Sequence, residues 1–459
     1  MQRAPLSPSA SFIAGSILAS AVGPLISLVD TAVGARISSQ DLAGLVLGSS
    51  LAGGIGWVVM QLIGGLPGVL GRLEGAERRQ DVARLGGEAV LAAAAIGLLL
   101  IVPIAAGLEG LCQFMAERDA TSEGAAHYIG LRLLGLPLIL VFQVLVAILR
   151  NVEKNAWTPL WATCGILLAN GACDVLFCLY LPLGLGGLAL ASAVTPLIGI
   201  MLCWRRLRQQ SLLDFSNQWS AIREQRLSSG LSLSLSLGGT ALLRGCLLNL
   251  TLIATSILAE RFGTEALGAH GLALQMWLLI AFSIDGFALA GQAYGSHLLG
   301  SGDRKATRQL AWRLYRLCLL GAGALGLVLY GLWDWLPVLF ALDGSAHLAF
   351  AELALPLLVQ IPLGVGAFVS DGMLQGAGDQ KFLAWQMGAA SLLGFPLALL
   401  SVPFNLPNLW WAVAFWLLIR MALGTARLAG DGWLELSDRQ MSSMVDASKH
   451  ATNDTSAAG

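Results

Sequence analysis

The chain alternates between long apolar stretches and short polar ones along most of its length. Because about 20 apolar residues cross the hydrocarbon core of a bilayer, twelve of these stretches are predicted to be membrane-spanning helices. They cover residues 11–35, 42–68, 86–108, 127–150, 158–181, 184–204, 230–259, 266–294, 312–333, 349–374, 383–403 and 407–428. The pattern therefore predicts an all-α membrane protein of twelve transmembrane helices.

Lysine and arginine are distributed unevenly among the polar stretches. The loops after even-numbered spans contain 17 of them, whereas the loops after odd-numbered spans contain only Arg36, Arg118 and Arg261. Because cytoplasmic loops are enriched in these residues, both termini are predicted to face the cytoplasm. The residues after position 430 are polar and are predicted to form a disordered cytoplasmic tail, 431–459.

The two halves of the chain resemble each other at an offset of about 224 residues, as where Asp41-Leu-Ala-Gly corresponds to Glu265-Ala-Leu-Gly. Six spans return the chain to the side where it began, so both halves have the same orientation. We predict two six-helix lobes related by pseudo-two-fold symmetry, an arrangement that transporters use for alternating access. The expected boundaries are 1–208 for the N-terminal lobe, 209–229 for a cytoplasmic linker and 230–430 for the C-terminal lobe.

Composition supports a membrane protein and gives no sign of an enzyme. Hydrophobic residues make up 56% of the chain and charged residues 12%, about half the usual charged fraction of soluble proteins. With a net charge of −1, the chain lacks the excess of positive charge that is typical of proteins that bind nucleic acids. The sequence contains no P-loop, no H-E-x-x-H, no D-D-x-x-D and no C-x-x-C motif. We therefore predict no enzyme activity and no cofactor, and an ion gradient is the natural energy source.

Four aspartates lie within the predicted spans, where a charge costs roughly 2.5–3.5 kcal/mol on insertion scales. They are Asp30, Asp174, Asp285 and Asp371. Asn170 precedes Asp174 by four residues, so both side chains project from one face of a helix. If Asp30 lies beside them, two carboxyl groups share a poorly solvated site and hold a proton between them. Such a site is suited to ion coupling.

Other interpretations of the embedded polar residues stay open. Asp30 could instead form a structural pair with Arg132 or Arg36. Asp285 and Asp371 each precede a glycine, and with Gln275 they are candidates for lining a cavity of the second lobe. Alternatively, the two aspartates bond backbone groups exposed at helix breaks. Arg132 and Arg244 are better explained as counter-ions than as substrate ligands.

Several stretches, in order along residues 11–428, resemble the multidrug and toxic compound extrusion (MATE) transporters. "PLISLVDTAVGARISSQDLAG" is similar to their first helix and loop, and "LRNVEKNAWTP", "NGACDVLF" and "LGLGGLALASAVT" to their fourth to sixth spans. "FSIDGFALAGQAYGSHLLGSGD" and "VSDGMLQGAGDQ" resemble the DinF branch in particular. The resemblance implies a two-lobe fold and efflux of cationic or amphipathic compounds driven by H⁺ or Na⁺.

The same resemblance implies a cation site in the first lobe. Its residues would be Asp30, Asn170, Asp174 and Ser192, with Na⁺ as one candidate ion at the first three. Serine stands where the family usually has threonine, and it keeps the hydroxyl. Span 7 departs from the family because it contains Arg244 and no acid in mid-membrane, which puts in doubt the second-lobe Na⁺ site of the sister branch.

The working hypothesis is a monomeric secondary exporter of the bacterial inner membrane. In contact with the lipid bilayer, it would exchange H⁺ or Na⁺ for a small amphipathic or cationic substrate, with coupling through Asp30 and Asp174. A lipid-linked precursor flippase is the first alternative, and a non-transporting membrane enzyme or scaffold is the second. Since flippases of this kind present several cationic residues in their cleft, two embedded arginines favour cationic or neutral cargo.

Overall fold

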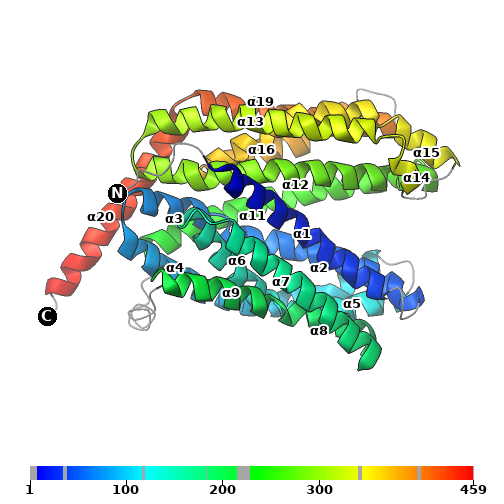
Figure 1. The fold of residues 1–459 in the computed structure, drawn as a ribbon, viewed down its shortest axis with the longest axis horizontal. Helices are drawn as coiled ribbons and strands as arrows, with labels where there is room; N and C mark the ends of the chain where they lie inside the picture. The colour runs from blue at the N-terminus through cyan, green and yellow to red at the C-terminus, as the bar shows by residue number, and fades with distance from the viewer. Residues whose placement is uncertain are drawn as a thin grey trace. The chain divides into compact units, whose positions relative to one another are not determined.

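The computed structural model describes residues 8–34, 39–115, 119–181, 183–213, 228–339, 344–400 and 405–457. Within these ranges the chain forms helices and no strands (Figure 1). An all-helical architecture satisfies backbone hydrogen bonds within each segment, as a chain surrounded by lipid requires.

The chain divides into two compact units, and each is described here by itself. The N-terminal unit comprises residues 18–238, and the C-terminal unit comprises residues 1–17 and 239–459. The division falls inside helix α1 (Ala10–Gly34) and inside helix α11 (Ser229–Glu260). The first and seventh spans therefore each contribute residues to both units, instead of belonging whole to one half of the chain.

The N-terminal unit contains the later part of α1 and the first turns of α11. Its other helices are α2 (Ser39–Met60), η1 (Gln61–Ile63), α3 (Leu66–Gly75), α4 (Arg79–Met115), α5 (Asp119–Leu133), α6 (Leu136–Asn151), α7 (Trp157–Val175), η2 (Leu176–Tyr180), α8 (Gly184–Val194) and α9 (Pro196–Gln209). Proline lies in the first turn of α3, α6 and α9, where its missing N–H leaves no intrahelical bond unmade. Helices α5 and α6 meet at such a junction with a bend of 52°, and only together are they long and apolar enough to cross a membrane.

The C-terminal unit is organised around α16 (Ala354–Ala377), which packs against α12 (Thr264–Gly300), α13 (Arg304–Gly331) and α19 (Leu406–Ala429). Figure 1 shows these helices running side by side. The unit also contains α14 (Leu336–Leu339), α15 (Gly344–Ala351), α17 (Gln380–Gly388), η3 (Ala389–Gly394), α18 (Phe395–Leu400) and α20 (Gly432–Ala457). Gly372 of α16 faces the backbone of Ala288 on α12, so the two helices approach closely.

Nine described helices are long and apolar enough to cross a membrane, or ten when the bent pair α5–α6 is one span. Several extend beyond the predicted spans, because hydropathy detects only the part of a helix that lies in lipid. Helix α4 begins at Arg79 and α13 at Arg304, each about two turns before its predicted span. The prediction of an all-α membrane protein is confirmed.

Residues 432–457, within the stretch for which the sequence predicts a disordered tail, form helix α20. Three of its side chains, Trp433, Leu434 and Met444, are buried against the C-terminal unit. The indole N–H of Trp433 donates to the carbonyl of Gly430, 3.1 Å away. A short apolar stripe on one face of a polar helix was enough to dock it. Most of the predicted linker 209–229 lies outside the described residues.

Candidate functional site

The first-lobe residues predicted from the sequence meet in the interior of the N-terminal unit. Asp30 of α1, Asn170 and Asp174 of α7 are each 0% exposed. The amide nitrogen Nδ2 of Asn170 donates to Asp30 Oδ1 at 2.6 Å and to Asp174 Oδ2 at 2.8 Å. Two carboxyl groups from different helices therefore share one amide nitrogen, in an environment without direct access to solvent.

Hydroxyl groups from the sixth span complete the cluster. The Ser192 hydroxyl on α8 lies 3.1 Å from Asp30 Oδ2 and 3.2 Å from Asn170 Oδ1. Thr195, one turn further along, places its hydroxyl 3.3 Å from the same amide oxygen. With its oxygen facing two hydroxyl donors, Asn170 turns its N–H groups toward the acids. The remaining oxygen of Asp174, Oδ1, is buried and has no hydrogen-bond partner among the described residues.

Local sequence explains why these helices meet. Asn170 and Asp174 are one helical turn apart on α7, which stacks their side chains on the same face. Gly171 lies beside Asn170, and a Cβ atom there would lie 3.4 Å from Cγ1 of Val29, the neighbour of Asp30. The two helices therefore lie in van der Waals contact range at the level of the two carboxyl groups.

Two residues of α5 extend the cluster, and one of them was missed from the sequence. The hydroxyl of Tyr128, which is buried, lies 3.3 Å from Asp30 Oδ2 and accepts a hydrogen bond from Arg132 Nη1. Arg132 Nη1 itself lies 3.6 Å from Asp30 Oδ2. The pairing of Asp30 with Arg132 thus occurs together with the carboxyl pair, not in place of it. The spacing of four residues between Tyr128 and Arg132 was the available signal.

The second-lobe candidates lie in different surroundings. Asp371 on α16 is buried, and its Oδ2 atom accepts from Arg244 Nη1 at 2.8 Å and from Arg420 Nη2 at 2.7 Å. On α12, Asp285 is half-buried and Gln275 is exposed. Arg244 is a counter-ion, as predicted. Arg420 of α19 is 2% exposed and was overlooked, although it lies inside the last predicted span.

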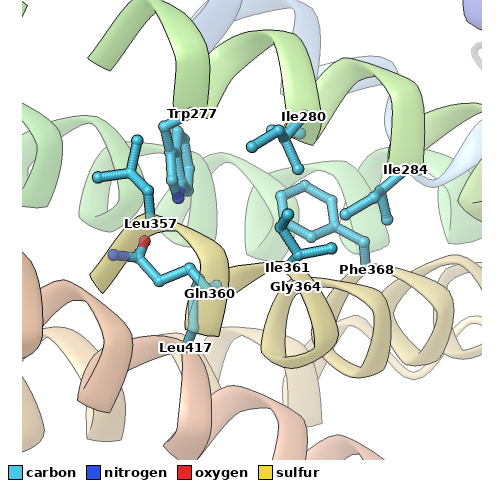
Figure 2. Close-up of a pocket in the computed structure, with 10 residues that line it drawn as sticks. Trp277, Ile280, Ile284, Leu357, Gln360, Ile361, Gly364, Phe368 and Leu417 are labelled. Atoms are coloured by element: carbon cyan, nitrogen blue, oxygen red, sulfur yellow. The ribbon is translucent and has the colours of Figure 1, made fainter. Parts of the chain in front are cut away.

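A small pocket lies beside this group of charges, between α12, α16 and α19. Its cavity volume is about 10 Å³, room for no more than one water molecule, and it is lined mainly by apolar residues. Figure 2 shows Trp277, Ile280 and Ile284 from α12 facing Gln360 and Phe368 from α16. The polar groups in this lining are the indole N–H of Trp277 and the amide of Gln360, whose Nε2 donates to the carbonyl of Trp410, 3.1 Å away.

A comparison with models of protein families identifies the family of this chain. Residues 16–176 and 241–400 each match the MatE family. The chain belongs to the MATE family. The second match begins 225 residues after the first, which agrees with the offset between the halves seen in the sequence. Together the two matches cover most of both halves, so each half of the chain supports the family assignment separately.

Curated proteins of a plant and of bacteria are similar to this chain. "Protein DETOXIFICATION 44, chloroplastic" of Arabidopsis thaliana is 26% identical, covering 90% of this chain and 80% of its own length. "DNA damage-inducible protein F" of Escherichia coli (strain K12) is 26% identical over 86% of each chain. "Probable multidrug resistance protein NorM" of Xanthomonas axonopodis pv. citri is also 26% identical, covering 79% of this chain and 81% of its own length. The predicted likeness to DinF and to multidrug transporters is confirmed.

Solved structures share the fold of this MATE protein. A MOP superfamily transporter from Pyrococcus furiosus matches with a TM-score of 0.81 and 17% identity, covering 91% of this chain and 95% of the other. The Vibrio cholerae MATE transporter VcmN in its bent form matches with a TM-score of 0.81 and 18% identity, covering 94% and 97%. The fold of twelve helices in two lobes is therefore confirmed. The protein is a multi-pass membrane transporter for small molecules and not an enzyme.

Proposed function

We propose that this MATE protein exports small amphipathic compounds in exchange for a cation that binds at Asp30 and Asp174. The observation that carries the proposal is the shared amide of Asn170, which holds the two carboxyl groups together at 2.6 and 2.8 Å in a fully buried site. A bound cation compensates one negative charge, whereas two bare carboxylates repel each other in a low-dielectric interior. Binding and release of the ion therefore change the interaction energy between Asp30 on α1 and Asp174 on α7.

The donor set favours H⁺ over Na⁺ as the coupling ion. Sodium would need oxygen ligands, yet Asn170 presents nitrogen to both acids while its oxygen accepts from Ser192 and Thr195. Sodium could use this residue only after the amide turned over and broke the two bonds from its nitrogen to the carboxyl groups. A proton needs no such change, because Asp174 Oδ1 has no partner in the described part of the chain and is free to carry it.

The network also links ion binding to a helix that belongs to both units. Asp30 is held by Asn170 of α7, Ser192 of α8 and Tyr128 of α5. Neutralising the pair weakens the charge-assisted bonds that fix α1 within the N-terminal unit. We infer that α1 shifts in response, and that the protein works by alternating access in the bacterial inner membrane with both termini in the cytoplasm.

Asp30→Asn tests the proposal, with Asp438→Asn as the matched control. Asp438 lies on the polar helix α20, where it is exposed and pairs with Arg304. It has no part in the proposed coupling. In everted vesicles, H⁺-driven transport of ethidium should be lost in Asp30→Asn and kept in Asp438→Asn at equal amounts of membrane-inserted protein. Imposing H⁺ and Na⁺ gradients separately identifies the ion. Normal ethidium transport by Asp30→Asn would overturn the proposal.

A further inference from the structure

The first turns of α13 carry a row of basic side chains on a face that does not pack against the rest of the C-terminal unit. Arg304, Arg308, Trp312 and Arg316 follow one another at intervals of four residues, which places them on one side of the helix. Arg308 is half-buried and the other three are exposed. The opposite side, which includes Leu310 and Leu314, is buried. The basic face is therefore available to a partner outside the protein.

This face borders a surface pocket, which we call the basic pocket. It is lined by Arg304, Lys305, Arg308 and Trp312 of α13, and by Asp431 and Leu434 at the start of α20. Its volume is about 440 Å³, within the range of roughly 300–1,000 Å³ that is usual for sites of small molecules. Basic groups together with the Trp312 ring and Leu434 give the pocket both a charged and an apolar part.

Acidic side chains balance only part of this positive charge. Asp431 pairs with Arg308, and Asp438 pairs with Arg304. Residues 303–316 and 431–439 together contain six basic and four acidic residues, which leaves the region net positive. Both ion pairs are exposed, and exposed pairs are weak because water and salt compete with them. An incoming anion can therefore replace Asp431 or Asp438 at little cost.

Several donors around the pocket have no acceptor. Lys305 and Arg316 form no ion pair or hydrogen bond with any described residue. Nε of Arg308 is buried and also lacks an acceptor among the described residues. The same guanidinium is held in place by its Nη2 atom, which donates to the carbonyl of Gly430, 3.2 Å away. A positioned guanidinium with a donor to spare suits a phosphate group.

The apolar part of α13 begins where the basic pocket ends. Helix α13 is long and apolar enough to cross a membrane, and its predicted apolar span begins at Trp312. Tryptophan at the end of a span is typical of the level of the lipid headgroups. Beyond Arg316 the row continues as Leu319 and Leu320, which are 41% and 72% exposed. The pocket therefore lies at the depth of lipid phosphates, and the two leucines lie at the depth of acyl chains.

We propose that the basic pocket binds an anionic phospholipid such as phosphatidylglycerol. Lys305 and Arg308 would bind the phosphate, Arg316 would attract it from one turn deeper, and Trp312 would pack against the glycerol backbone. Clusters of basic residues next to a membrane-spanning helix attract anionic headgroups in this way. A soluble phosphate would leave the exposed leucines unused, whereas a phospholipid covers them with its acyl chains. The site follows from the fold of the C-terminal unit and does not depend on the proposed export function.

Fluorescence anisotropy tests the site on the purified full-length chain in dodecyl maltoside, with acyl-labelled NBD-phosphatidylglycerol as the probe. The wild type should bind this probe at least tenfold more tightly than the matching NBD-phosphatidylcholine. Lys305→Gln and Arg316→Gln should each weaken binding about fivefold, since each removes one positive charge near the phosphate. Asp431→Asn should strengthen binding about fivefold, because it leaves Arg308 to the phosphate.

Arg261→Gln is the matched control for Arg316→Gln. Arg261 is exposed in the turn between α11 and α12, and the 37 residues of α12 separate that turn from the loop that leads into α13. Over such a length salt screens the attraction between charges. Arg261→Gln should therefore bind the probe as the wild type does.

Three results would overturn the inference. Equal affinity of the wild type for the two lipids would show that the headgroup is not recognised. Equal losses in Arg316→Gln and Arg261→Gln would show only a general attraction to positive charge. Displacement of the probe by glycerol 3-phosphate would assign the pocket to a soluble phosphate. Ethidium transport, measured separately on the same variants, tests the proposed function, so failure of one proposal is distinguishable from failure of the other.

Discussion

The contact between α12 and α16 gives a prediction whose size follows from the geometry. Replacing Gly372 by alanine would put a Cβ atom 2.2 Å from the carbonyl oxygen of Ala288, where ordinary contact begins at 3.4 Å. The atom in the way is backbone, so no side chain can turn aside. The two helices must therefore move apart by about 1.2 Å or distort locally. A matched control is Gly323→Ala in α13, where a Cβ atom meets nothing within 4 Å.

Two effects of opposite sign set the expected magnitude. Overpacking costs about 1–3 kcal/mol, whereas replacing a helical glycine by alanine contributes up to about 1 kcal/mol of stability. Gly323→Ala should show only the gain. Gly372→Ala should therefore be less stable than Gly323→Ala by about 1–3 kcal/mol, which corresponds to several degrees in unfolding temperature for a unit of this size.

Thermal unfolding of the purified protein measures this difference. A thiol-reactive fluorophore suits the assay, because Cys318 in the same unit is free and buried and becomes reactive only on unfolding. Both variants should be compared in one detergent at one concentration. The reasoning is refuted if Gly372→Ala unfolds at the same temperature as Gly323→Ala or above it. In that case α12 and α16 would accommodate a Cβ atom at position 372 without strain.

Three further predictions concern the N-terminal unit. Tyr128→Phe keeps the buried ring but removes the hydroxyl between Arg132 and Asp30, so the initial rate of ethidium export should fall about tenfold with an unchanged unfolding temperature; an unchanged rate would exclude this hydroxyl from coupling. Asn170→Ala removes both bonds to the carboxyl groups and should reduce export about 100-fold, whereas Asn249→Ala should export normally because its Nδ2 bonds no described residue. Burial, which outweighs the attraction of Glu74, lowers the pKa of Lys154 in the α6–α7 loop from 10.5 to about 7. Between these two values the unfolded chain binds more protons than the folded protein, so the unfolding temperature should rise as pH increases above about 7, and a Lys154→Met variant that keeps the same rise would contradict this.

The first-lobe site was largely predictable because its signals are local. An aspartate in an apolar run is visible in the sequence, and the spacing of Asn170 and Asp174 places them on one helix face. The signal for Tyr128, its spacing of four residues from Arg132, was weaker, since a tyrosine in a span is usually a packing residue. The direction of the Asn170 amide was also beyond the sequence, because Ser192 and Thr195 decide it from another helix.

The tail and the two arginines that bond Asp371 gave no such local signal in the sequence. Residues 432–457 are polar on average, and the burial of Trp433 and Met444 against the C-terminal unit accounts for the helix there. Arg420 lies 49 residues from Asp371, and Arg244 lies 127 residues from it. No spacing rule connects positions so far apart, and each arginine alone looks like an ordinary counter-ion.

The spans, the duplication and the acids that lipid would exclude are all visible in the amino-acid sequence. These follow from hydropathy and charge, which act on each segment independently and can be read along the chain. The folded structure was needed to show which acid pairs with which base and in which direction the Asn170 amide points. It was also needed to show which arginines lie beside the apolar pocket. Those are properties of helix packing, where the fit of side chains from distant segments sets the electrostatic surroundings of every charge.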